Sequence, residues 1–283
     1  ALPAAPSEGP LPRRRIRAVV TDVDGTLFSA WGSEQPVSAG NGRALARAME
    51  QGISVCLATG RIPGPWSDAV RGQLPGLGPG VFANGALVLG AGGEVLAESC
   101  LPQAAEEVVR QYTLGGRAGG GGQLMLLAAT RWEAAGPSYG SLRYVELAPQ
   151  GPTWATDLIK SAGEPDVVLL PDLGGICSGR VLKFVLFTKP GEPGWASMPE
   201  VVRVLRLQLE AAGATVVDCG PRHCEVLPPG VHKGVGMLRL LEHLGVGADE
   251  TLACGDGPND VEMLQMAGVG AAVGNAGPEA RAA

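Results

Sequence analysis

Two acidic side chains, Asp22 and Asp24, follow directly after a short apolar run near the start of the chain, in the stretch VVTDVDGTLF. Desolvation and mutual repulsion both oppose placing two carboxylates where a buried strand ends. A polar turn would explain the pair, because Asp-Gly is a common turn sequence. The alternative is that a bound cation offsets the two negative charges.

Other polar residues suited to phosphate and metal chemistry stand beside apolar runs elsewhere in the chain. They are Thr59 in ATGR, Lys233 at the start of a helical pattern, and Asp256, Asn259 and Asp260 in GDGPND. Carboxylates are ligands that Mg²⁺ prefers, and hydroxyl, amide and ammonium groups can donate to phosphoryl oxygens. Each segment alone is more typical of a turn, a helix cap or a surface lysine. Their joint occurrence indicates a site for Mg²⁺ and a phosphate.

The surrounding sequence predicts elements that would bring these residues together. Apolar runs typical of buried strands cover residues 16–20, 53–58, 81–83, 251–254 and 268–273. Helical patterns separate them, including one over residues 234–244. Strands that alternate with helices predict a parallel sheet with right-handed crossovers. Ligands bind at the carboxyl ends of such strands, where the polar residues stand.

The four polar segments resemble the haloacid dehalogenase superfamily of phosphohydrolases. DVDGTL is similar to the first motif of that family, Thr59 to the second, Lys233 to the third and GDGPND to the fourth. The segments FANGA, residues 82–86, and EVLPPGVHKG, residues 225–234, resemble the Cof-like subgroup. This resemblance implies a Rossmann-like α/β core, with helices on both faces of a parallel sheet, and an inserted α+β cap of the C2 type.

The resemblance also implies a role for each residue. Asp22 would be the nucleophile that forms an aspartyl-phosphate, and Asp24 the general acid and base. Asp22, the backbone carbonyl of Asp24, and Asp256 would hold Mg²⁺. The remaining implied roles are phosphate binding for Thr59, Lys233 and Asn259, and a place near the metal or beside Lys233 for Asp260.

The middle third of the chain follows a mixed pattern, and we expect it to form the cap. The predicted division is a flexible tail over residues 1–15, a core over residues 16–85 and 222–283, and a cap over residues 86–221. Asn84 is expected to shape the pocket between cap and core. Arg61 is expected near the site as well, with a structural ion pair as the alternative.

The predicted function is Mg²⁺-dependent hydrolysis of a small phosphorylated metabolite, with sugar phosphates as the expected class. Two alternatives stay open: a structural subunit of a larger assembly that retains the fold, and a phosphotransferase or mutase. Substrate identity, oligomeric state and assembly partners do not follow from the sequence.

Charge, hydropathy and cysteine content indicate which classes of partner and which cellular compartment to expect. The net charge of −6 argues against nucleic acid as a partner, and no apolar run is long enough to predict a membrane span. The six cysteines are dispersed without a CxxC pair, which suits reduced thiols in an intracellular compartment. We expect the cytoplasm, or an organelle such as the plastid stroma if the N-terminal segment is the remainder of a transit peptide.

Overall fold

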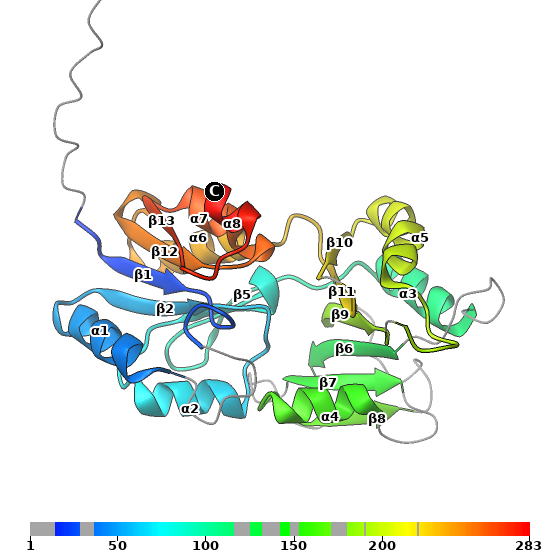
Figure 1. Cartoon of the computed structure of the whole chain (residues 1–283). Helices are drawn as coiled ribbons and strands as arrows, with labels where there is room; N and C mark the ends of the chain where they lie inside the picture. The colour runs from blue at the N-terminus through cyan, green and yellow to red at the C-terminus, as the bar shows by residue number, and fades with distance from the viewer. Residues whose placement is uncertain are drawn as a thin grey trace, which may run out of the picture.

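The computed structural model describes residues 15–28, 37–115, 125–131, 142–147, 153–170, 180–189, 191–219 and 221–283. Over these residues the chain forms two lobes that lie side by side, each built around its own sheet (Figure 1). The predicted flexible tail lies outside the described residues except for Arg15, and so does the glycine-rich segment after Gly115.

The first lobe contains a seven-stranded sheet in the order β13-β12-β1-β2-β3-β4-β5. Its strands are β1 (Ala18–Thr21), β2 (Ser54–Ala58), β3 (Gly80–Phe82), β4 (Leu87–Leu89), β5 (Val95–Glu98), β12 (Thr251–Gly255) and β13 (Val269–Ala272). The pairings from β13 to β3 are parallel, whereas β4 and β5 add an antiparallel edge. The predicted parallel core is therefore confirmed.

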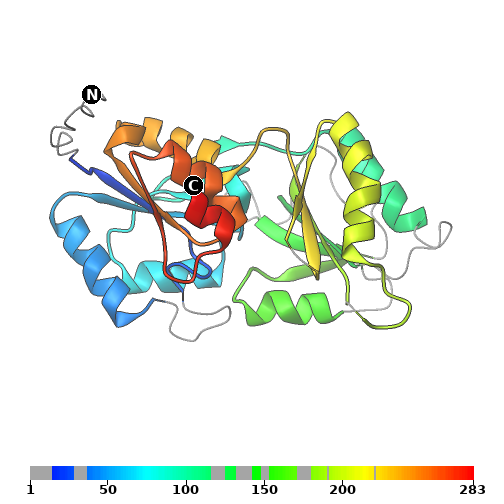
Figure 2. The same cartoon turned by 45° about the horizontal axis from the view of Figure 1, so that its top comes forward.

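Helices cover both faces of this sheet (Figure 2). They are α1 (Ala39–Glu50), α2 (Pro65–Gln73), α6 (Lys233–Leu244), α7 (Val261–Met266) and α8 (Pro278–Ala282). Alternate residues of β1 point to opposite faces, as in any strand. Val19 belongs to the cluster with α1 and α2, whereas Ala18 and Val20 pack with α6, α7 and α8. Burial on both faces explains why β1 is apolar throughout.

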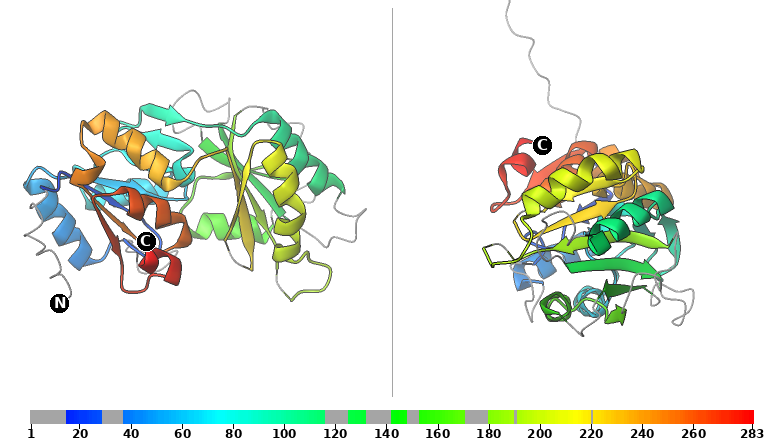
Figure 3. Two further views of the ribbon diagram at one scale, coloured as in Figure 1. Left: turned by 90° about the horizontal axis from the view of Figure 1, so that it is seen from above. Right: turned by 90° about the vertical axis from the view of Figure 1, so that its right-hand side faces the viewer.

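The second lobe is the cap, with a six-stranded sheet in the order β10-β11-β9-β6-β7-β8. Its strands are β6 (Met125–Arg131), β7 (Leu142–Leu147), β8 (Val167–Leu170), β9 (Val181–Phe187), β10 (Thr215–Asp218) and β11 (His223–Leu227). Helices α3 (Gln103–Gly115) and α5 (Met198–Ala211) cover its outer face (Figure 3). Phe184 and Leu186 of β9 pack under these helices, which leaves the other face of the strand for the core.

The inner face of the cap sheet and helix α4 (Trp154–Ser161) pack toward the first lobe. One hydrophobic cluster contains Ile62 and Trp66 of the core together with Tyr144 and Ile159 of the cap. The backbone N–H of Trp66 also donates to the carbonyl of Gly163, at 3.0 Å. The lobes therefore share a buried interface.

The two sheets divide the chain differently from the predicted boundaries at residues 86 and 221. Strand β4 forms an antiparallel hairpin with β3 through the short 3₁₀ turn Ala83–Gly85, so β4 and β5 extend the core sheet. Strand β11 lies between β9 and β10, so the cap sheet continues to Leu227. Among the described helices, none has the length and apolarity needed to cross a bilayer.

Candidate active site

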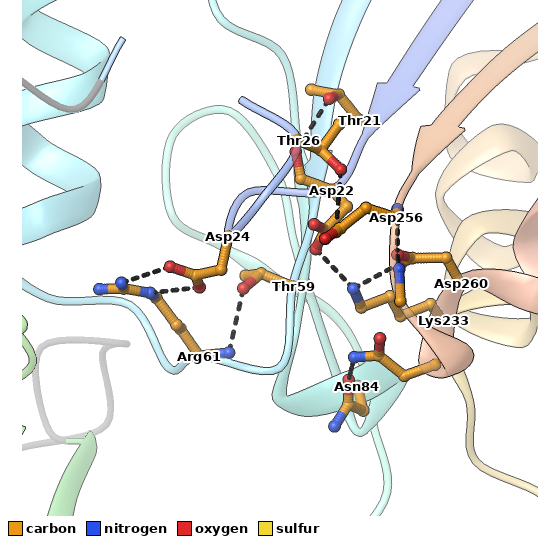
Figure 4. Close-up of polar contacts among 12 residues, drawn as sticks. Thr21, Asp22, Asp24, Thr26, Thr59, Arg61, Asn84, Lys233, Asp256 and Asp260 are labelled. Atoms are coloured by element: carbon orange, nitrogen blue, oxygen red, sulfur yellow. Dashed lines mark hydrogen bonds and ion pairs between the residues drawn. The ribbon is translucent and has the colours of Figure 1, made fainter. Parts of the chain in front are cut away.

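Chain segments that are distant in sequence meet at the carboxyl ends of β1, β2 and β12 (Figure 4). Strand β1 lies between the other two, and Thr21 is in register with Leu57 on one side and Cys254 on the other. The residues that follow these strand ends, Asp22, Thr59 and Asp256, therefore emerge at one edge of the sheet. Helix α6 begins beside them with Lys233.

Lys233 is the cation of this cluster. It is 1% exposed, and its Nζ donates to Asp22 Oδ1 at 2.6 Å and to Asp260 Oδ1 at 2.7 Å. Burial acts to lower the pKa of Lys233, but the charges and hydrogen bonds of the two carboxylates outweigh burial and raise it. The ammonium is therefore held charged.

Asp22 is buried beside Lys233, but only one of its carboxylate oxygens has a partner. Its Oδ2 is buried with no hydrogen bond among the described residues. Burial raises the pKa of Asp22 to about 7, with a further rise from Asp260, while Lys233 opposes the change. A buried carboxylate oxygen without a hydrogen-bond partner is free to coordinate a metal ion or to act as a nucleophile. A divalent cation would also favour the ionised carboxylate.

The donor set at this position fits Mg²⁺. Carboxylate oxygens of Asp22, Asp256 and Asp260 lie within 4.8 Å of one another. Asp260 is the least free of the three, because its Oδ1 accepts from Lys233 and its Oδ2 accepts from the N–H groups of Asp256 and Gly257, both at 3.0 Å. We infer that Asp260 orients the lysine and the loop, whereas Asp22 and Asp256 offer oxygens to a metal.

Asp256 is held by residues that the sequence analysis did not single out. Thr26 donates to its Oδ1 at 3.2 Å, and Asn275 donates to its Oδ2 at 3.4 Å and to the carbonyl of Gly25 at 2.8 Å. Gly25 has a φ of +86°, and a Cβ there would lie 2.2 Å from Asp256 Oδ2. The Asp-Gly turn is thus required by the approach of the second acid. The sequence signals for these residues were the threonine of DVDGTL and the asparagine of VGNAG.

Asp24 lies apart from the lysine cluster and pairs with Arg61 (Figure 4). The guanidinium donates Nε–H to Asp24 Oδ2 at 2.7 Å and an Nη2–H to Oδ1 at 2.6 Å, a bidentate pair. Arg61 also donates to the carbonyl of Ala162 in the cap at 2.7 Å and lies 3.9 Å from the Glu164 carboxylate. The alternative of an ion pair for Arg61 is therefore observed, and the contacts of the same guanidinium with Ala162 and Glu164 join the core to the cap.

The other predicted residues are Thr59, which lies next to Arg61, and the hydrogen-bonded pair Asn84 and Asn259. Thr59 is 1% exposed, and its Oγ1 accepts from the N–H of Arg61 at 3.1 Å, whereas no residue in the described part of the chain accepts its hydroxyl proton. Asn259 donates to Asn84 Oδ1 at 3.0 Å. Asn84 in turn donates to Glu225 of the cap at 2.7 Å. Asn84 thus bridges core and cap.

Three charged cap residues near the site were missed by sequence reasoning. Lys183 and Glu225 are buried on β9 and β11, and Glu164 is buried after α4. The signal for Lys183 was a lone charge within the apolar strand VLKFVLF. Burial raises the pKa of Glu164 to about 8, although Arg61 and Lys183 oppose the change. These side chains make the cap side of the interface polar next to Asp24 and Thr59.

Comparison with known proteins places this geometry in context. A family model described as haloacid dehalogenase-like hydrolase matches residues 19–114 and 200–283. A crystal structure of a haloacid dehalogenase-like hydrolase from Bacteroides thetaiotaomicron is similar with a TM-score of 0.73 and 23% identity, covering 95% of this chain and 92% of that one. At this identity the structure supports the fold alone.

Two curated relatives are similar over most of this chain. One is the chloroplastic endoribonuclease YBEY of Arabidopsis thaliana, which is 30% identical over 93% of this chain and 42% of its own length. The other is the 5-amino-6-(5-phospho-D-ribitylamino)uracil phosphatase YwtE of Bacillus subtilis, 23% identical over 92% of this chain and 88% of its own. The chain therefore spans less than half of the plant protein and most of the bacterial one.

Proposed function

Because the chain belongs to the haloacid dehalogenase-like hydrolases, we propose that it is a Mg²⁺-dependent phosphatase acting on a small phosphorylated metabolite. The observation that carries the proposal is the arrangement around Asp22. Its Oδ1 is bound by a buried lysine, and its Oδ2 has no partner among the described residues. A carboxylate held in this way is fixed in orientation but keeps one oxygen for the reaction.

Asp22 is the proposed nucleophile. One of its carboxylate oxygens attacks phosphorus, and the bond between phosphorus and the ester oxygen breaks as an aspartyl-phosphate forms. Asp24 must carry a proton when substrate is bound, and it transfers this proton to the ester oxygen as that bond breaks, so the leaving group departs as an alcohol and Asp24 is left as a carboxylate. Asp24 then takes a proton from water, the water oxygen attacks phosphorus, and inorganic phosphate leaves with Asp22 restored.

The bidentate pair with Arg61 fixes the position of Asp24 but also occupies both of its oxygens. Both oxygens of Asp24 accept from the guanidinium, which holds the carboxylate in one place between core and cap. Proton transfer requires at least one of these hydrogen bonds to open when substrate is bound. The Glu164 carboxylate, 3.9 Å from Arg61, can then keep the guanidinium partly neutralised.

Asp22, Asp256 and the backbone carbonyl of Asp24 are the proposed metal ligands. Bound Mg²⁺ supplies neutralisation of the charge on the phosphoryl oxygens. Lys233, Thr59 and Asn259 are the proposed phosphate-binding groups, since they offer an ammonium, a hydroxyl and an amide at the same edge of the sheet. Phosphoryl transfer depends mainly on such positioning and charge stabilisation.

Sugar phosphates and sugar-alcohol phosphates are the proposed substrate class. The bacterial relative is named for a substrate that carries its phosphate on a ribityl group. An intracellular, reducing compartment such as a plastid stroma is proposed from the buried free thiols Cys56 and Cys224 and from the chloroplastic name of the plant relative.

The test is a phosphatase assay of the purified chain with p-nitrophenyl phosphate, with added Mg²⁺ and with EDTA. We expect hydrolysis that requires Mg²⁺ and is lost in the Asp22→Asn variant. A screen of sugar phosphates and other phosphorylated metabolites at fixed Mg²⁺ then identifies the substrate. Absence of hydrolysis across the whole screen, by a protein that is folded, would refute the proposal and favour a structural subunit.

A further inference from the structure

We propose that Lys183 and Glu225, a buried ion pair of the cap sheet, are positioning residues for the phosphate-binding groups Thr59 and Asn259 of the core. This inference rests on the proposed function, because it concerns the groups expected to bind phosphate. Phosphate binding would then depend on the packing of the cap against the core.

The ion pair lies on two neighbouring strands, β9 and β11, and is almost completely buried. Lys183 is 2% exposed and Glu225 is 8% exposed, and the Lys183 Nζ lies 2.6 Å from Glu225 Oε1. Both side chains extend beyond the cap, because each also hydrogen-bonds a core residue. Burying two charges is costly, and the hydrogen bonds to Gly60 and Asn84 satisfy polar atoms of the pair from the core side.

One arm of the network runs from Lys183 to the loop after β2. Lys183 Nζ donates to the carbonyl of Gly60 at 2.7 Å, and Gly60 directly follows Thr59. The N–H of Asn84 donates to the carbonyl of Thr59 at 3.0 Å on the other side of this loop. The backbone around Thr59 is therefore held from both the cap and the core.

The second arm runs from Glu225 through Asn84 to Asn259. Glu225 Oε2 accepts from Asn84 Nδ2 at 2.7 Å, and Asn84 Oδ1 accepts from Asn259 Nδ2 at 3.0 Å. A carboxylate only accepts hydrogen bonds, so Asn84 must turn its NH₂ group toward Glu225. Its carbonyl then faces Asn259, which must present its own NH₂ group. The cap carboxylate thus determines the orientation of two core amides in series.

The backbone at Asn84 forms the tight turn between β3 and β4. Ala83 and Asn84 have φ values of +48° and +54°, which such hairpin turns require and which asparagine tolerates. The N–H groups of Ala83 and Asn84 donate to the carbonyls of Arg61 and Thr59. The turn therefore lies directly against the loop that carries Thr59, and it presents the Asn84 side chain to Glu225 and Asn259.

Both arms begin at one cap ion pair, and each ends at a group expected to bind phosphate: one at the loop that contains Thr59, the other at Asn259. Seating of the cap therefore orders the phosphate-binding groups. By linkage, phosphate bound to those groups favours the seated cap.

The experiment compares Glu225→Gln, Lys183→Met and the double variant Lys183→Met/Glu225→Leu with the wild-type chain. The double variant removes both charges together, so it leaves no unpaired buried charge and keeps the test available if a single variant does not fold. The matched control is Glu146→Gln. Glu146 is a fully buried carboxylate of the same sheet, and the hydroxyl groups that donate to it, those of Thr153 and Thr156, both lie in the cap.

The readouts are the KM and kcat for p-nitrophenyl phosphate and the Kd of inorganic phosphate measured by calorimetry with Mg²⁺ present. We expect the network variants to weaken phosphate binding and raise KM about tenfold or more, with the control within about twofold of wild type. Equal values for all variants and wild type would overturn the inference. An equal loss in the control would also overturn it, because cap stability alone would then explain the effect.

Hydrogen exchange of residues 57–62 and 256–261 separates this inference from the proposed function. We expect faster exchange in both segments in the network variants and wild-type exchange in the Glu146→Gln control. If the wild-type chain hydrolyses no phosphate ester but shows this exchange pattern, the network stands and the proposed function fails. If hydrolysis is normal and exchange does not change, the network fails and the proposed function stands.

Discussion

The ammonium of Lys233 lies 2.6 Å from the carboxylate of Asp22, although 211 positions separate the two residues in the chain. Lys233 opens α6, Asp22 follows β1, and the sheet places both at the same edge. Any function of this edge depends on the two charges remaining paired and buried.

Replacing Asp22 by Asn is expected to abolish turnover of p-nitrophenyl phosphate, with a loss of at least about 10³-fold in kcat, because an amide does not act as the nucleophile. The fold should remain, since Asp260 still pairs with Lys233. The measurement is steady-state hydrolysis together with the circular dichroism spectrum. Wild-type turnover in this variant would rule out the proposed mechanism.

Replacing Asp24 by Asn is expected to separate the two chemical steps. p-Nitrophenolate is a good leaving group and needs little protonation, whereas hydrolysis of the aspartyl-phosphate still needs a base. Rapid mixing should therefore show a burst of about one equivalent of p-nitrophenolate and then a steady rate about 10²-fold or more below wild type. Asp22→Asn serves as the control and should show no burst. A steady rate equal to wild type would contradict the assigned role.

Replacing Lys233 by Met leaves Asp22 and Asp260 buried without their cation. Loss of one partner from a buried ion pair typically lowers the free energy of unfolding by about 3–5 kcal/mol. Added Mg²⁺ should recover part of this loss, because a bound cation offsets the same carboxylates. Urea denaturation with and without Mg²⁺ tests this. Lys160→Met, at an exposed position, should change the free energy by less than about 0.5 kcal/mol. No response to Mg²⁺ in Lys233→Met would argue against a metal site here.

The raised pKa of Glu164 is expected to make the free energy of unfolding depend on pH. Burial raises its pKa from 4.5 to about 8, so between these values the folded chain binds more protons than the unfolded chain. This contribution to stability is fully present below pH 4.5 and is lost as pH rises through about 8. Glu164→Gln should remove it. Between pH 5 and 8, wild type should lose on the order of 2–4 kcal/mol relative to the variant. Urea denaturation at several pH values measures the difference, and parallel pH profiles for the two proteins would contradict it.

Replacing Gly25 by Ala is expected to weaken activation by Mg²⁺. The new Cβ would lie 2.2 Å from Asp256 Oδ2, and the φ of +86° adds backbone strain. Gly52→Ala is the matched control, because Gly52 has a φ of +77° but no atom within 4 Å of the added Cβ. Mg²⁺ titration of hydrolysis should shift to concentrations about tenfold or more higher in Gly25→Ala only. The same shift in both variants would show that strain alone is responsible.

The sequence by itself determined the parallel core and the convergence of its polar strand ends. Apolar runs alternate with helical patterns, and the carboxyl ends of parallel strands share one edge. This local information was enough to expect Asp22, Lys233 and Asp256 in one place, and the structure brings them together. Their catalytic and metal-binding roles stay predictions.

Only the tertiary structure decided which residues of the cap reach the core. Whether Lys183 faces the outer helices or the core depends on the direction from which the cap sheet packs, and the strand sequence does not contain that direction. The domain boundaries differ from the predicted ones for the same reason. β4 was expected in the cap but pairs with β3 of the core sheet, and β11 was expected in the core but lies between β9 and β10 of the cap sheet. Pairing partners and packing direction are properties of the whole fold, whereas strand ends and turns are properties of a few adjacent residues.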